Sequence, residues 1–194
     1  MKRAYLIIIS ALLFLSFASP QLDFNQKKLQ KLIMKTYELE NYELLKANVP
    51  NCNFRHGELF FVKSNDNQKR LIYIGRVNSC RSGGCSLEIA SDSETDLEEF
   101  EYFDYVIFFD STITIQKVVI FNYQATHGYE VTAKSWLKQF NRYNGMSELV
   151  VGKNVDAISG ATISVYAITD DISYVLSQLR ENVSIILSST LNKN

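Results

Sequence analysis

The sequence lacks the excess of basic residues that nucleic-acid-binding proteins usually carry. Its 20 lysines and arginines are balanced by 21 acidic residues, which gives a formal net charge of −1. A basic patch or stripe is the electrostatic feature expected of a protein that binds DNA or RNA. The charge balance therefore argues against nucleic acid as a partner.

Metal ligands, long apolar segments and repeats are scarce as well. The chain has two histidines and three cysteines, and His56 and the cysteines show no spacing typical of a zinc site. Beyond residue 18 no stretch is apolar enough to cross a membrane. We find no internal repeat and no linker, so residues 19–194 predict a single domain with its own hydrophobic core.

The N-terminus has the pattern of a secretory signal peptide. Lys2 and Arg3 precede the mostly apolar residues 4–18, and Ser-Phe-Ala at 16–18 has the small-x-small pattern of a cleavage site. This predicts cleavage near Ala18 and export to the periplasm or cell envelope. The alternative is a retained membrane anchor, but the run is shorter than the ~18–20 residues that span a bilayer.

Export would place the cysteines in an oxidising compartment, where disulfides form. Cys80 and Cys85 flank Gly83 and Gly84, which permit a tight turn between them. The sequence thus favours a Cys80–Cys85 disulfide. Cys52 remains an alternative partner for either cysteine.

Hydrophobic periodicity predicts helices at both ends of the domain and two hairpins between them. Apolar residues at helical spacing favour a helix over residues 25–46. Short runs rich in β-branched and aromatic residues, separated by turn-forming residues, predict two antiparallel hairpins. Their strands are residues 58–63 with 70–75, and residues 102–109 with 113–123. The second hairpin is so apolar that we expect it to lie centrally in the sheet.

The C-terminal half predicts a short helix after Gly128 and a long amphipathic helix from Ile163 through Leu187. The expected fold is therefore α+β, an antiparallel sheet of two hairpins covered by helices. Between the hairpins, residues 91–101 include six acidic side chains. This stretch is interpreted as a solvated loop or, alternatively, as a docking face for a basic partner.

The most informative motif is Asp-Ala-Ile-Ser-Gly-Ala-Thr at residues 156–162, immediately before the long helix. Free N–H groups at a helix start, together with the helix dipole, can bind a phosphate. Ser159 is a natural N-cap, and Gly160 and Ala161 leave room for a bulky ligand. Physical chemistry alone predicts an anion site or an ordinary capped helix.

The seven residues resemble the attachment motif of bacterial FMN-binding domains, in which an acidic residue precedes Ser/Thr-Gly-Ala-Thr. The flavin-bearing subunits of the sodium-pumping NADH:quinone reductase and of the Rnf complex are members of that family. The resemblance implies that a flavin transferase esterifies the phosphate of FMN onto Thr162. Asp156 would then hold the loop through hydrogen bonds to backbone N–H groups, unless it is a simple turn former.

A second set of residues could contact the flavin ring. Thr126, His127 and Gly128 end a predicted strand, and Trp136 follows on a short helix. A ring site needs a flat apolar wall, close backbone approach and a few polar groups. The family often has Glu-Thr-Pro-Gly here, whereas this chain has Ala125 and His127 in place of the glutamate and proline. His127 is interpreted either as a turn residue or as a partner of the reduced flavin.

These observations predict an exported flavoprotein that carries covalent FMN and transfers electrons, rather than a stand-alone enzyme. A threonine hydroxyl is a poor nucleophile without an adjacent base, and the local sequence supplies none. The implied partners are a flavin transferase and a membrane or periplasmic redox protein. Two alternatives stay open: a thiol–disulfide redox protein using Cys80 and Cys85, and a secreted binding module without a cofactor.

Overall fold

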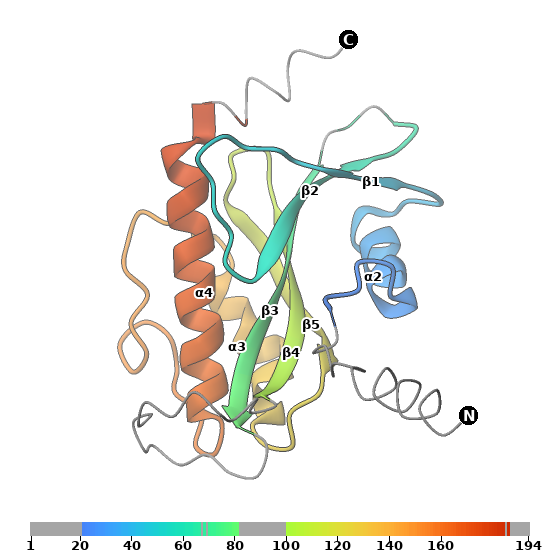
Figure 1. Cartoon of the computed structure of the whole chain (residues 1–194). Coiled ribbons are helices and arrows are strands. Elements are labelled where there is room, and N and C mark those ends of the chain that lie inside the picture. Colours follow the sequence, from blue (N-terminus) through green and yellow to red (C-terminus); the bar gives the residue numbers. More distant parts are fainter. Residues whose placement is uncertain (1–20, 67, 69, 82–99, 185, 187–194) are drawn as a thin grey trace, which may run out of the picture.

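The structure is a computed structural model that describes residues 21–66, 68, 70–81, 100–184 and 186 (Figure 1). The predicted signal peptide, residues 1–18, lies outside these ranges, as does most of the acidic stretch at 91–101. Cys85 and the side chain of Cys80 also lie outside them, and the predicted disulfide with them. Among the described residues, Cys52 forms no disulfide.

The fold is built on one antiparallel sheet in which each strand pairs with the next one along the chain. The strands are β1 (Glu43–Lys46), β2 (Gly57–Lys63), β3 (Arg70–Arg81), β4 (Phe100–Phe109) and β5 (Ile115–Tyr123), in the spatial order β1-β2-β3-β4-β5. Both predicted hairpins are confirmed, as β2–β3 and β4–β5. The predicted α+β class is confirmed as well.

The first helix is shorter than the sequence predicts, and the end of its predicted range is a strand. Helix α2 spans Lys27–Tyr37. Glu38 then adopts a left-handed conformation (φ 55°), and the Leu39 N–H donates back to the Met34 carbonyl, which closes the helix. The chain is thereby redirected so that residues 43–46 pair with β2 as strand β1.

The hairpin of β4 and β5 is also less central than predicted, because β5 is an edge strand. Its side chains are nevertheless buried on both faces of the sheet. Val118 and Ile120 belong to one core cluster and Phe121 to the other. The apolar character of β5 thus comes from layers above and below it, and does not indicate a central place in the sheet.

Helices cover both faces of the sheet (Figure 1). The long helix α4 (Thr162–Glu181) lies on one face and α2 on the other. The short α3 (Lys134–Leu137) lies between two 3₁₀ turns, η2 (Tyr129–Thr132) and η3 (Lys138–Phe140). Helix α4 ends at Glu181, before the predicted end at Leu187, which lies outside the described residues. No helix in the described ranges is both long and apolar enough to span a bilayer.

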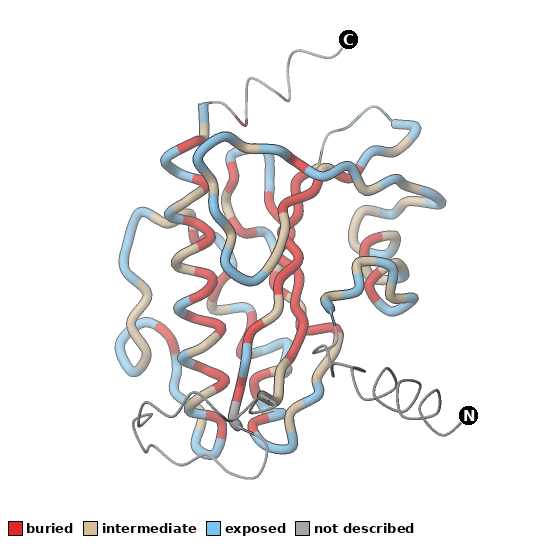
Figure 2. Tube along the Cα trace, in the orientation of Figure 1, coloured by how far each residue is buried: buried red, intermediate tan, exposed pale blue. Residues whose placement is uncertain are grey.

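The middle strands are buried along much of their length (Figure 2), and their side chains alternate between two separate cores. Tyr73 on β3 and Tyr105 on β4 belong to the core under α4, whereas their neighbours Ile74 and Val106 belong to the core under α2. Successive side chains of a strand point to opposite faces, so two buried faces require continuous apolar runs. The hydrophobic runs of β3 and β4 are explained by this three-layer arrangement.

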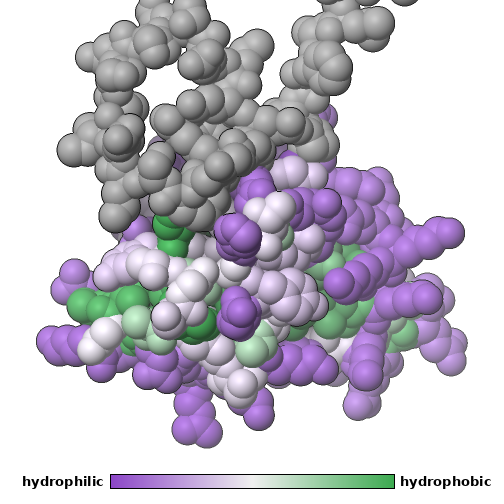
Figure 3. Space-filling view, turned by 90° about the horizontal axis from the view of Figure 1, so that it is seen from below, coloured by the Kyte–Doolittle hydropathy of each residue, from purple (hydrophilic) through white to green (hydrophobic). Residues whose placement is uncertain are grey.

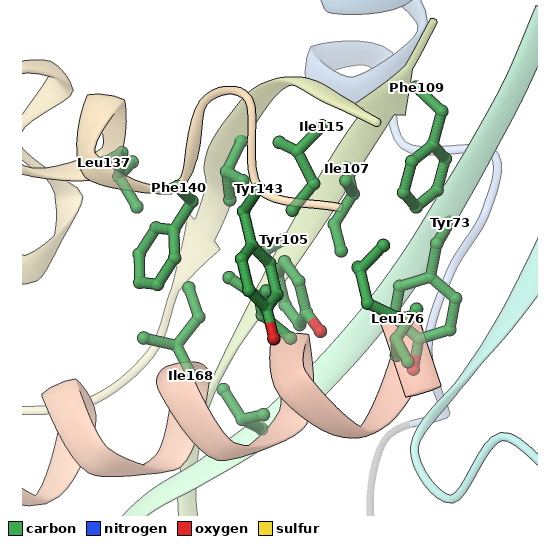
Figure 4. Close-up of a cluster of buried hydrophobic side chains, with 14 of the residues drawn as sticks. Tyr73, Tyr105, Ile107, Phe109, Ile115, Leu137, Phe140, Tyr143, Ile168 and Leu176 are labelled. Atoms are coloured by element: carbon green, nitrogen blue, oxygen red, sulfur yellow. The ribbon is translucent and has the colours of Figure 1, made fainter. Parts of the chain in front are cut away.

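One carboxylate is buried between α4 and the sheet. Asp171 is 7% exposed and accepts a hydrogen bond from the hydroxyl of Tyr105, which points toward α4 in Figure 4. The His56 Nδ1 atom lies 3.6 Å from the other Asp171 oxygen. Burial raises the pKa of Asp171, and the Tyr105 hydrogen bond and His56 oppose that rise.

We expect the free energy of unfolding of Asp171→Asn to rise relative to that of the parent protein as the pH rises. The folded state retains the Asp171 proton at a pH where the unfolded chain, with a pKa of about 3.9, has lost it. Stability contributed by this group therefore falls as the pH rises above that value, and asparagine removes the dependence. Urea unfolding near pH 4 and pH 7 measures the change, with Asp170→Asn on the exposed side of the helix as the control. A difference in the free energy of unfolding between variant and parent that stays constant with pH would contradict a raised pKa for Asp171.

Candidate functional site

The attachment motif forms a surface loop fixed at both ends by buried residues. Val155 is 1% exposed and Ala161 is 2% exposed, and both belong to the core under α4. Between them Asp156, Ser159 and Gly160 are exposed. The loop is therefore anchored at its ends while its middle faces solvent.

Thr162 is the first residue of α4, and its side chain is exposed. Gly160 has φ +82°, and a Cβ atom built there would meet nothing within 4 Å. This glycine is required by backbone conformation, and the space beside it is open. The structure thus presents an accessible hydroxyl at the start of a 20-residue helix.

The predicted N-cap is wrong. Ala161 occupies the cap position of α4, and no side chain caps the helix there. Ser159 lies two residues before that position, because the left-handed Gly160 turns the chain before the helix begins. The first N–H groups of α4 are consequently left without a serine partner, which favours an external anion at this end.

The turn at residues 126–128 packs directly against this helix start. Gly128 is buried and has φ +82°. A Cβ atom at this position would lie 2.9 Å from Ser164 Oγ and 3.3 Å from the Cα of Ala161. The fold thereby brings together the two segments that the sequence singled out, and only glycine permits so close an approach.

Hydroxyl groups connect the turn, the helix and strand β3 beneath the surface. Ser79 Oγ and Ser164 Oγ share a hydrogen bond of 2.7 Å, and both residues are buried. The Tyr123 hydroxyl donates to the His127 carbonyl and lies 3.5 Å from Ser164 Oγ. These contacts fix the position of the turn relative to α4.

A glutamate from the start of β4 holds Thr126. One Glu101 oxygen accepts the Thr126 N–H at 2.9 Å, and the other accepts the Thr126 hydroxyl at 2.7 Å. The hydrogen bond from the Thr126 side chain lowers the pKa of Glu101, with further contributions from the backbone N–H and from His127. Thr126 and His127 are exposed, and they directly precede Gly128, which packs against Ala161 at the start of α4.

Trp136 stabilises the backbone of the 156–162 motif through a hydrogen bond. Its ring is 8% exposed, and its Nε1 donates to the Asp156 carbonyl at 2.8 Å. The Asp156 N–H in turn donates to Gln139 Oε1 at 2.7 Å. The backbone of Asp156 is therefore held on both sides, and Trp136 acts mainly as a positioning residue for the loop.

Sequence reasoning missed three of these residues. Glu101 was noticed only as one acid of the stretch at 91–101, and nothing in the local sequence marks Ser79 or Ser164 as partners. Their roles depend on which strand ends meet the helix, and that is a property of topology. Asp156 was expected to hold the loop with its carboxylate, but its described hydrogen bonds use its backbone.

The end of the molecule that carries these residues is shown in Figure 3, where hydrophilic and intermediate surface lies between apolar patches. Two exposed tyrosines adjoin the two segments. Tyr129 follows Gly128 and is 68% exposed, and Tyr166 is 48% exposed. Tyr166 lies one helical turn after Thr162, so both occupy the same face of α4. Flat aromatic surface is thus available beside the exposed hydroxyl.

The structure has a cavity away from the start of α4, and its described part shows no candidate metal site. An open cavity of about 410 Å³ is lined by residues of the β1–β2 connection, including Cys52. Cys52 contacts Gln178 near the far end of α4. Within the described residues, no three His, Cys, Asp or Glu side chains are grouped so that they could hold a metal ion.

Comparison with known proteins agrees with the site. No curated protein matches this sequence. The family model of the FMN-binding domain matches residues 103–177, which include β5, α3, the 126–128 turn and the whole 156–162 motif. The predicted resemblance to FMN-binding domains is therefore confirmed over residues 103–177.

Proposed function

We propose that this protein carries FMN esterified through its phosphate to Thr162 and works as an electron carrier outside the cytoplasm. Binding of FMN follows from the family match. The proposal adds the covalent bond, the role in electron transfer and the location. The observation that carries it is the exposed Thr162 hydroxyl at the open start of α4, next to the 126–128 turn.

The residues present fit a flavin phosphate. Several N–H groups at the start of α4 have no partner within the helix, and the helix dipole places partial positive charge there. The open space at Gly160 leaves room for the phosphate oxygens. An ester at Thr162 would keep the remaining negative charge at the position where the helix stabilises it best.

Thr162 is better suited to be modified than to catalyse. In the described part of the chain no side chain forms a hydrogen bond with its hydroxyl, so no base is in place to remove the proton. A separate flavin transferase would supply that base and an activated flavin phosphate. In that step the Thr162 oxygen would bond to phosphorus, the bond from phosphorus to the activating group would break, and the hydroxyl proton would pass to the base. The product would have the composition of the protein plus FMN less one water.

The ring would lie against the surface formed by the 126–128 turn and the two exposed tyrosines. Thr126 is held by Glu101, and Gly128 allows close backbone approach. When bound, the flavin would supply reversible uptake and release of electrons. The bond to Thr162 at the phosphate end of the flavin and the 126–128 turn at its ring end would together hold the exposed edge of the ring in place for a redox partner.

A covalent bond suits the proposed location. The N-terminal residues 1–18 predict export, and a cofactor that dissociates outside the cytoplasm would be diluted and not replaced. The partners would be the flavin transferase and a membrane or periplasmic redox protein.

The hydroxyl at position 162 is expected to be necessary for attachment. We expect Thr162→Ala, co-expressed with a flavin transferase, to lose all flavin fluorescence on a denaturing gel, because the ester oxygen is gone. Thr162→Ser, which keeps a hydroxyl, should retain at least part of the fluorescence. Ser159→Ala removes another exposed hydroxyl of the same loop and serves as the matched control.

Two outcomes would count against the proposal. One is a fluorescent band that persists in Thr162→Ala, and the other is its loss in Ser159→Ala at unchanged stability. The parent protein should also bleach with dithionite and recover its colour in air. A protein that binds flavin but cannot be reduced reversibly would contradict the role in electron transfer.

A further inference from the structure

Helix α2 carries four lysines on one side. Lys27, Lys28, Lys31 and Lys35 are all exposed, and they fall within about 100° of the helix circumference at 3.6 residues per turn. The buried side of the helix, Leu29 and Ile33, lies on the opposite side and packs on the sheet. The fold therefore turns every lysine of this helix outward.

This arrangement is unfavourable for the helix itself. Lys27–Lys31 and Lys31–Lys35 are like-charge pairs at i, i+4 spacing, which destabilise a helix. Lys27 and Lys28 occupy the first turn, where the helix dipole disfavours cations and where no acidic residue is present. Among the described residues, none of these lysines forms an ion pair. An external anion would relieve both repulsions.

Two further lysines extend the surface beyond α2. Lys117 of β5 donates a hydrogen bond to the Thr36 hydroxyl at 3.4 Å, which places it beside the helix. Burial lowers the pKa of Lys117, and the nearby charges of Lys134 and Lys35 lower it further. We call the six residues Lys27, Lys28, Lys31, Lys35, Lys117 and Lys134 the lysine face.

We propose that the lysine face docks this protein on an anionic lipid surface. Four to eight basic residues grouped on an amphipathic helix are a typical pattern for binding anionic headgroups. This inference stands independently of the proposed flavin.

The composition of the lysine face favours lipid over an acidic protein. Protein interfaces usually have a core of aromatic, methionine or arginine side chains. The exposed large apolar residues of the described chain are Leu45, Tyr129, Met146 and Tyr166, and none of them lies on α2.

Docking in this way would leave the candidate flavin site accessible. Helix α2 lies on the face of the sheet opposite α4 (Figure 1), and Thr162 begins α4. A redox partner could therefore approach Thr162 while the lysine face rests on the membrane.

Vesicle flotation of the mature chain, residues 19–194, tests the proposal. We expect binding to phosphatidylcholine vesicles that contain phosphatidylglycerol to exceed binding to phosphatidylcholine alone, and to weaken as salt is added. Each lysine near such a surface contributes about fivefold in binding at low salt, from about 1 kcal/mol per residue. Lys27→Gln/Lys31→Gln should thus bind more than about tenfold more weakly.

The matched control is Lys63→Gln/Lys153→Gln, which removes two exposed lysines outside the lysine face and should bind like the parent. Equal weakening of both variants would show a general charge effect and overturn the proposal. So would equal binding to both kinds of vesicle. Binding to polyglutamate-coated beads without binding to anionic vesicles would assign the face to an acidic protein instead.

Discussion

Replacing Gly128 with alanine is expected to destabilise the fold by about 2–5 kcal/mol, the sum of a backbone and a packing cost. The residue has φ +82°, where any side chain is strained by about 1–2 kcal/mol. The added Cβ would also lie 2.9 Å from Ser164 Oγ and 3.3 Å from the Cα of Ala161. Relief would require the turn to move away from α4.

Gly160→Ala separates the two contributions. This glycine has the same φ of +82°, but a Cβ there meets nothing within 4 Å. Only the backbone cost of about 1–2 kcal/mol should remain. Urea unfolding of both variants measures the difference. Equal destabilisation would mean that the 126–128 turn does not pack against the helix start as described.

Replacing Arg76 with methionine is expected to cost about 3–5 kcal/mol, because it leaves a buried charge without its main partner. Asp104 is 0% exposed and accepts from Arg76 Nε at 2.6 Å and from Arg76 Nη2 at 3.1 Å. Asn122 Nδ2 donates a further hydrogen bond at 2.7 Å. One neutral amide cannot replace a guanidinium as a partner for this carboxylate.

The surface pair of Lys46 and Glu58 provides the control. Its Nζ–Oε1 distance of 2.7 Å is similar, but the lysine side chain is 57% exposed. Lys46→Met should therefore cost no more than about 1 kcal/mol. The double variant Arg76→Met/Asp104→Asn should recover part of the loss. Similar costs for the two single variants, measured by thermal or urea unfolding, would contradict the importance of burial.

Much of the fold could be predicted because local patterns and tertiary environment agree. The short apolar runs of β2 to β5, rich in β-branched and aromatic residues, are typical of strands, and the apolar stripe of α4 has the period of a helix. The predictions fail where contacts with neighbouring segments determine the secondary structure. Residues 43–46 carry a sequence compatible with a helix and become β1 because β2 offers them an edge.

The candidate site shows the same division. The motif at 156–162 and the turn at 126–128 are recognisable from their resemblance to FMN-binding domains, and the family match includes both. The proximity of these two segments, and the hydrogen bonds of Glu101, Ser79 and Ser164, depend on contacts between residues that are distant in sequence. Trp136 is predicted to lie near the flavin ring, but this residue is 8% exposed, donates to the Asp156 carbonyl and offers little surface to a ligand.

The central claim is that the side-chain oxygen of Thr162 is bonded to the phosphorus of a flavin phosphate. The most direct measurement is the mass of the protein isolated from its native cell and denatured, followed by fragmentation of the peptide that contains residues 156–162. We predict an increase equal to FMN less one water, located on Thr162. An unmodified peptide, or a flavin located on Ser159 or Ser164, would contradict the account.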